Sequence, residues 1–106
     1  MDNLYYTELF NVYKMLEKQA VDTFDLPRTD LAAFARFSIL ARFARELMTE
    51  AEAYKCNYSR IYEEELAHKF EALKCGTRGL YKDIEGALKM RADAIKAGLQ
   101  VTVLAS

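Results

Sequence analysis

A glutamate and the only histidine of the chain lie three residues apart, in the segment Glu65-Leu66-Ala67-His68. In a helix this E-x-x-H spacing places a carboxylate and an imidazole on one side, about one turn apart. Both groups bind transition metals. The spacing therefore makes Glu65 and His68 candidate ligands of iron or manganese.

Two E-x-x-H motifs and two further glutamates form the di-iron carboxylate centres of ferritin-like four-helix bundles. The segment from residue 63 to residue 68 locally resembles the short encapsulated ferritins. This resemblance implies a homo-oligomer in which a second copy supplies the second motif across a two-fold axis. Such a site also needs an upstream glutamate, for which Glu46, Glu50 and Glu52 are available.

The position of His68 favours a simpler interpretation. On a helix it points roughly opposite to Leu66 and Phe70, which places it away from the core of its own chain. A metal would then have to lie between subunits. We favour a solvent-exposed histidine and expect no cofactor, since a single histidine also excludes an ordinary multi-histidine zinc centre within one chain.

The two cysteines, Cys56 and Cys75, are isolated in the sequence and do not form a disulfide framework. As nucleophiles each would need a positioned base, and His68 is the one histidine available. We expect reduced, structural thiols and no enzymatic activity.

A basic, glycine-containing segment runs from residue 74 to residue 79, Lys-Cys-Gly-Thr-Arg-Gly. If a helix starts there, its free amides together with Lys74, Arg78 and Lys82 provide an anion site for a small phosphorylated ligand. The spacing is neither that of a Walker loop nor that of a dinucleotide fingerprint. An ordinary connection between two helices is the interpretation we favour.

The segment from residue 30 to residue 54 carries more apolar residues than one buried helix face needs. Ile39 and Phe43 fall outside its main apolar face, beside Arg36. Single apolar residues are left over in the same way on the neighbouring segments. The residues expected to form an interface are Phe10, Met15, Arg36, Ile39, Phe43 and Met90. We expect a homodimer or a higher oligomer.

The composition favours an all-α fold. The 106 residues are 52% hydrophobic, with one proline and four glycines, which is sufficient for a core and unfavourable for disorder. We expect one helical domain over residues 1 to 106, built as a four-helix bundle with short loops. The expected helices span residues 2 or 3 to 21, 30 to 54 or 56, 59 to 74, and 77 to 97, the second being the longest.

Several residues mark the expected ends of these helices. Thr29 or Asp30 caps the second helix, and residues 57 to 59 break or kink it. Gly76 and Gly98 end the third and fourth helices, leaving a strand-like tail at about residues 99 to 106. Arg91 lies within the apolar arc of the fourth helix, so it either extends its guanidinium to water or meets a carboxylate.

The formal net charge is −1, which gives no general attraction to nucleic acid or to an anionic membrane. Arg36, Arg42 and Arg45 lie close to phenylalanines in the sequence, yet Arg42 and Arg45 can pair with acids on their own helix, so nucleic acid is not the expected partner. The sequence contains neither a leader-like segment nor a membrane-spanning run. We therefore expect a cytoplasmic protein.

Together these features indicate a small helical module that binds proteins and associates with itself. Small helical proteins with few motifs often act as accessory regulators, chaperones or inhibitors, including those of phages and plasmids. The two alternatives are the oligomeric metal site at Glu65 and His68 and the phosphorylated-ligand site at residues 74 to 82.

Overall fold

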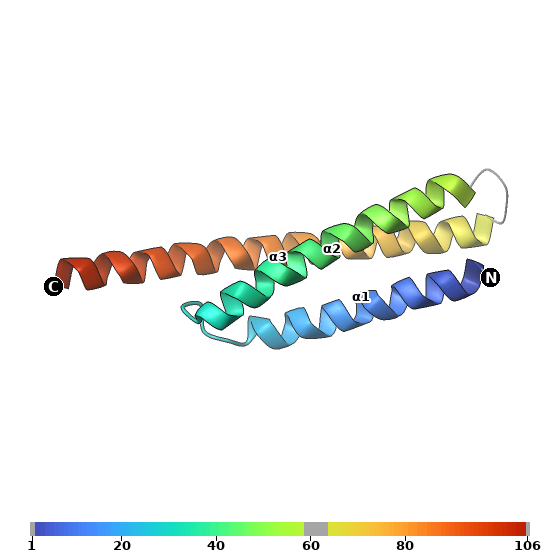
Figure 1. The fold of residues 1–106 in the computed structure, drawn as a ribbon. Helices are drawn as coiled ribbons and strands as arrows, with labels where there is room; N and C mark the ends of the chain where they lie inside the picture. Colours follow the sequence, from blue (N-terminus) through green and yellow to red (C-terminus); the bar gives the residue numbers. More distant parts are fainter. Residues whose placement is uncertain (1, 59–63, 106) are drawn as a thin grey trace.

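The chain forms three helices in the computed structural model, which describes the backbone of residues 2 to 58 and 64 to 105 and the side chains of residues 4 to 54 and 64 to 99. The helices are α1 (Asp2–Phe24), α2 (Leu31–Tyr58) and α3 (Glu64–Ala105). α1 and α2 form an antiparallel hairpin that lies along α3, giving a rod of 65 × 20 × 14 Å (Figure 1). The predicted all-α class is confirmed, whereas the predicted four-helix bundle is wrong, because three helices are observed.

The third and fourth predicted helices are a single helix, α3, which has 42 residues against 28 in α2. The prediction that Gly76 ends a helix is wrong, as is the prediction that the second helix is the longest. The buried residues of α3 keep one 4-3-4-3 spacing through Gly76, as in a coiled coil. They are Leu66, Phe70, Leu73, Thr77, Leu80, Ile84, Ala87 and Arg91. This unbroken buried stripe holds the glycine in the helix.

The C-terminal part of α3 extends past the α1–α2 hairpin (Figure 1). The prediction that Gly98 ends a helix and that a strand-like tail follows is wrong, since the helix continues to Ala105. Leu99, on this projecting part, is 62% exposed. The end of α3 is thus a helix that the hairpin does not cover.

The same coiled-coil spacing orders the other two helices. The buried residues of α2 are Ala33, Phe37, Leu40, Ala44, Leu47 and Ala51. α1 contributes Leu16, Ala20 and Thr23. The buried Thr23 and Thr77 hydroxyls donate to the carbonyls of Gln19 and Leu73, four residues earlier, at 2.6 and 2.7 Å. No hydroxyl of these two residues is therefore left unsatisfied in the core.

Aromatic side chains close the core where the N-terminus of α1 meets the start of α3. The rings of Tyr5 and Tyr54 lie 4.4 Å apart, and those of Tyr54 and Phe70 lie 4.5 Å apart, centroid to centroid. Tyr6 meets Phe70 edge-on at 5.5 Å. These tyrosines belong to the rim of the core.

The α1–α2 connection is fixed by a helix cap and by Arg91. Asp30 accepts hydrogen bonds from the amides of Ala32 and Ala33 at 2.8 and 3.1 Å, which confirms it as the N-cap of α2. Arg91 Nη2 donates to the carbonyls of residues 23, 24 and 26 at 3.1, 3.4 and 2.9 Å. Arg91 is 4% exposed, so both predictions for it are wrong: it caps the C-terminal end of α1.

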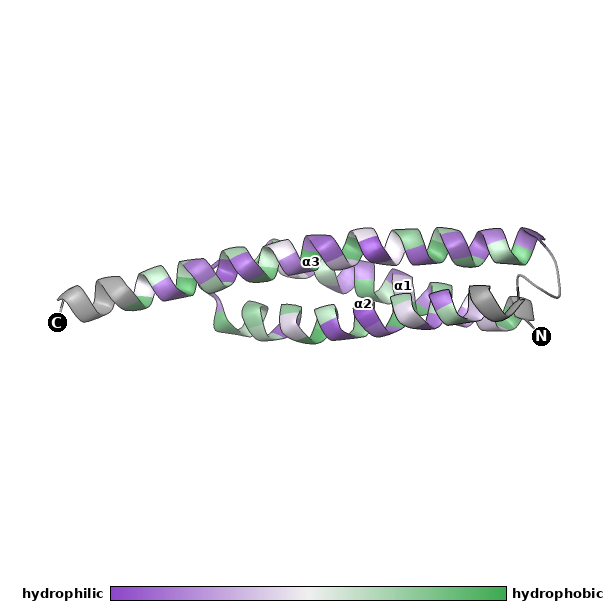
Figure 2. Cartoon of the chain, turned by 90° about the horizontal axis from the view of Figure 1, so that it is seen from above, coloured by the Kyte–Doolittle hydropathy of each residue, from purple (hydrophilic) through white to green (hydrophobic). Residues whose placement is uncertain are grey.

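Polar and apolar residues are interspersed along all three helices (Figure 2). Within the described ranges, no helix combines the length and the apolar character needed to cross a membrane.

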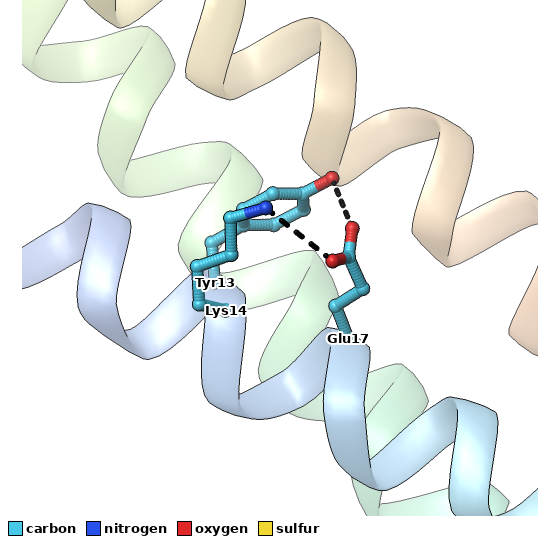
Figure 3. A network of polar contacts seen from close by, with 3 residues as sticks. All are labelled: Tyr13, Lys14 and Glu17. Atoms are coloured by element: carbon cyan, nitrogen blue, oxygen red, sulfur yellow. Dashed lines mark hydrogen bonds and ion pairs between the residues drawn. The ribbon is translucent and has the colours of Figure 1, made fainter.

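Gly76 of α3 lies next to Tyr13 of α1. A Cβ at Gly76 would come within 3.1 Å of the Tyr13 hydroxyl oxygen. That hydroxyl donates to Glu17 at 3.0 Å, and Lys14 contacts the same carboxylate at 3.5 Å (Figure 3). Burial, followed by the hydrogen bond to Glu17 and its charge, raises the pKa of Tyr13. Glycine at position 76 therefore permits a close contact between the two helices.

The contact predicts opposite outcomes for one substitution at two glycines of α3. Gly79→Ala is expected to stabilise the protein by about 1 kcal/mol, because a Cβ there meets no atom within 4 Å and alanine favours the helix. Gly76→Ala is expected to give no such gain, because the Tyr13 ring must shift. Urea unfolding of both variants measures the difference, and an equal gain at both positions would contradict the close contact.

Candidate functional site

Within the described part of the single chain, no further metal ligand lies beside the predicted pair Glu65 and His68. Glu65 and His68 are both exposed, and Glu65 lies 4.0 Å from Lys69. Across the described side chains, no three His, Cys, Asp or Glu residues are close enough together to hold a metal ion. Cys75 is a free, exposed thiol, and its Sγ lies 3.7 Å from Glu71. The side chain of Cys56 lies outside the described residues.

The predicted anion site is divided among different surroundings. Because α3 is continuous, its backbone has no helix start near residue 77. Lys74 forms an ion pair with Glu52 of α2, and its side chain is 15% exposed. Arg78 is exposed on the surface of α3, and Lys82 lines a hollow next to α1. Lys74 is thus already paired, and no free helix amides lie beside the other two cations.

Three of the six predicted interface residues lie together, in a hollow between α1 and α2. Met15, Ile39 and Phe43 are 61%, 55% and 51% exposed. This apolar hollow has a volume of about 220 Å³ and is also lined by Val12, Leu16, Gln19 and Leu40. Apolar side chains exposed side by side are typical of surfaces that bind another protein.

The other predicted interface residues lie elsewhere or at the edge. Phe10 is half-buried between α1 and α3, where it packs against Tyr6 and Tyr13. Met90 lies on α3, beside Phe24. Arg36 is exposed on α2, one helical turn before Ile39 and Leu40.

The exposed residues beside the apolar hollow form a regular stripe on α2. They recur at spacings of 4, 3, 4, 3 and 4, which is the spacing of a coiled-coil seam. We call this the outer stripe: Ala32, Arg36, Ile39, Phe43, Glu46 and Glu50, all exposed. Its centre is apolar, and its two flanks carry opposite charges.

The two charges nearest the centre are unpaired. Neither the Arg36 guanidinium nor the Glu46 carboxylate has a hydrogen-bond or ion-pair partner among the described residues. Each lies three residues from the apolar pair, Arg36 before Ile39 and Glu46 after Phe43. Both charged groups are therefore free to meet a partner of opposite charge.

The far end of the outer stripe is already occupied. The Tyr5 hydroxyl donates a hydrogen bond to the Glu50 carboxylate across α1 and α2. Burial, together with this bond and the charges of Glu50 and Glu8, raises the pKa of Tyr5 to about 12. Tyr5 thus remains a donor throughout the neutral range and ties Glu50 to its own chain.

Val12 is not among the six predicted interface residues, although it lines the apolar hollow and its side chain is 43% exposed. No excess of apolar residues around Val12 in the sequence indicated this exposure.

Comparisons with protein-family models, with curated proteins and with solved structures find no match to this chain.

Proposed function

We propose that this chain is a helical protein-interaction module that works as an antiparallel homodimer. The two copies meet through the outer stripes of α2, and Val12 and Met15 of α1 extend the contact. The observation that carries the proposal is the palindromic order of the outer stripe about the level of residue 41.

A two-fold axis at that level places Ile39 of one copy opposite Phe43 of the other. Both side chains are about half-exposed in the single chain, so pairing removes apolar surface from water on both copies. Val12 and Met15 of α1 line the same hollow as Ile39 and Phe43, so they add apolar surface on both sides of the axis. The exposed apolar residues thus form a surface that matches itself.

Charge selects the antiparallel arrangement. The same two-fold axis places Arg36 of one copy opposite Glu46 of the other, which gives two ion pairs per dimer. A parallel, in-register pairing would place Arg36 opposite Arg36 and Glu46 opposite Glu46, and facing like charges disfavour a complex.

The antiparallel dimer would be a rod in which the uncovered ends of the two α3 helices point in opposite directions. Each end would then be available to contact another protein, which suits an accessory regulator or an adaptor. The regulatory role is expected from the size and helical class of the chain, whereas the outer stripe supports the dimer.

Charge exchange between copies tests the pairing. Arg36→Glu and Glu46→Arg are each expected to weaken self-association about 30-fold, because two exposed pairs of about 1 kcal/mol each turn repulsive. Mixed together, the two variants should form a heterodimer. In it the new glutamate at position 36 faces the new arginine at position 46, and the native Glu46 of the first variant faces the native Arg36 of the second. Native mass spectrometry of the mixture, with one variant isotopically labelled, measures the heterodimer fraction.

Arg78→Glu is the matched control, because it makes the same charge change on the exposed surface of α3. Mixed with Glu46→Arg, it should give no preference for the heterodimer. A random mixture from the Arg36→Glu and Glu46→Arg pair would overturn the antiparallel register.

A further inference from the structure

A second hollow lies on another side of the molecule, between the C-terminal end of α1, the following loop and α3. Its volume is about 400 Å³, which is within the range of small-molecule sites. Phe24 of α1 and Arg28 of the loop line one wall of it. The opposite wall is formed by α3, through Lys82, Gly86, Met90 and Arg91. We call it the cationic hollow. It shares no residue with the apolar hollow or with the outer stripe.

The positive charges of the cationic hollow are not neutralised within the described part of the chain. Arg28 and Lys82 are exposed and have no ion-pair partner there. Arg91 forms part of the wall with its side chain almost fully buried, and its hydrogen bonds go to carbonyl oxygens. Its Nε is buried without an acceptor. One carboxylate, Asp83, also lines the hollow, so an excess of positive charge remains.

The hollow also offers an apolar surface beside these cations. Phe24 and Met90 are 39% and 46% exposed, although both are large apolar side chains. An aromatic ring and a methionine are suitable surfaces for a flat ring, and arginine and lysine are the usual ligands of a phosphate. An apolar surface for a flat ring and cations for a phosphate thus line the same hollow.

We propose that the cationic hollow binds a nucleotide unit. The phosphate contacts Arg28 and Lys82, the positive charge of Arg91 supports it from the wall, and the base lies against Phe24 and Met90. A free mononucleotide and a single-stranded nucleic acid both present this unit. This site does not depend on dimerisation, because its residues lie on α1, the loop and α3.

Gly86 allows the hollow to be filled without disturbing the fold. A Cβ there meets no atom within 4 Å, so a larger side chain enters open space. Gly86→Leu is therefore expected to leave the helix intact and to occupy the place of the ligand. Gly79→Leu is the matched control, because its Cβ is equally free and it lies outside the cationic hollow.

The test is calorimetric titration of the full chain with adenosine monophosphate, with inorganic phosphate and with a single-stranded oligothymidylate. We expect saturable binding of adenosine monophosphate or of the oligonucleotide, weakened about tenfold or more by Gly86→Leu and unchanged by Gly79→Leu. Binding of the mononucleotide identifies a free nucleotide as a sufficient ligand, and binding of the oligonucleotide alone identifies the strand as the source. Circular dichroism checks that both variants remain helical.

Three results would overturn the proposal: no binding of either nucleotide probe, equal binding by Gly86→Leu, or inorganic phosphate binding as tightly as adenosine monophosphate. The last result would show that Phe24 and Met90 contribute nothing. Lys82→Gln provides a second variant, and an unchanged affinity in it would remove the assigned phosphate contact.

Discussion

Phe43→Glu is expected to convert the proposed homodimer into monomers without unfolding the chain. In the single chain Phe43 is 51% exposed, so a carboxylate at this position can remain hydrated. In the antiparallel dimer it would lie near the two-fold axis against Ile39 of the other copy, and burying an unpaired charge there is strongly unfavourable. We expect self-association to weaken at least 100-fold, corresponding to about 3 kcal/mol. Sedimentation equilibrium measures the change, and circular dichroism reports the helix content.

Val21→Glu provides the control for this prediction. Val21 is 55% exposed on α1, close to the exposure of Phe43, but it lines the α1–α3 side of the molecule. The same substitution at Val21 should leave the dimer intact. If Phe43→Glu associated as tightly as the unmodified chain, the outer stripe would not be the interface.

Arg91→Met is expected to destabilise the folded chain by about 3 kcal/mol. The methionine keeps much of the aliphatic volume but removes the Nη2 donor that three carbonyls at the end of α1 share. It also removes the contact of the guanidinium with the Phe37 ring, whose centroid lies 4.7 Å from Cζ. The part-buried carbonyls of Phe24 and Leu26, which lose their donor, account for most of the expected loss, while the Thr23 carbonyl keeps the Leu26 amide as a donor. Urea unfolding in the Phe43→Glu background measures it independently of association.

Arg78→Met is the corresponding control, because Arg78 is exposed on the same helix. It is expected to change the free energy of unfolding by less than about 0.5 kcal/mol. If Arg91→Met were equally mild, Arg91 would not be an important cap of α1, and the α1–α2 connection would be held by other contacts.

The helical class and the approximate positions of α1 and α2 followed from the sequence, because their apolar residues recur with the helical period. The predicted ends at Gly76 and Gly98 were wrong, because a glycine on its own favours the end of a helix and the surrounding residues outweigh it. A glycine disfavours a helix by about 1 kcal/mol, which is small beside the burial of Phe70, Leu80 and Ile84 on either side of Gly76. The continuous spacing of buried residues from 66 to 91 was the signal that could have shown one helix.

Only part of the apolar hollow could be predicted from the sequence. Ile39 and Phe43 stood out because α2 has more apolar residues than its buried stripe uses. Phe10 was assigned to the surface, yet α1 packs against two helices and therefore buries a wider face than one stripe. The cationic hollow depends on how the loop carrying Arg28 lies against α3, and no spacing within the sequence encodes that contact.

The most direct measurement is the native mass of the unmodified chain, recorded over a series of protein concentrations beside Phe43→Glu. The subunit mass is 12.2 kDa, so dimerisation through the outer stripe predicts twice this mass for the unmodified chain and the single mass for the variant. A single-subunit mass for the unmodified chain at every concentration would contradict the homodimer.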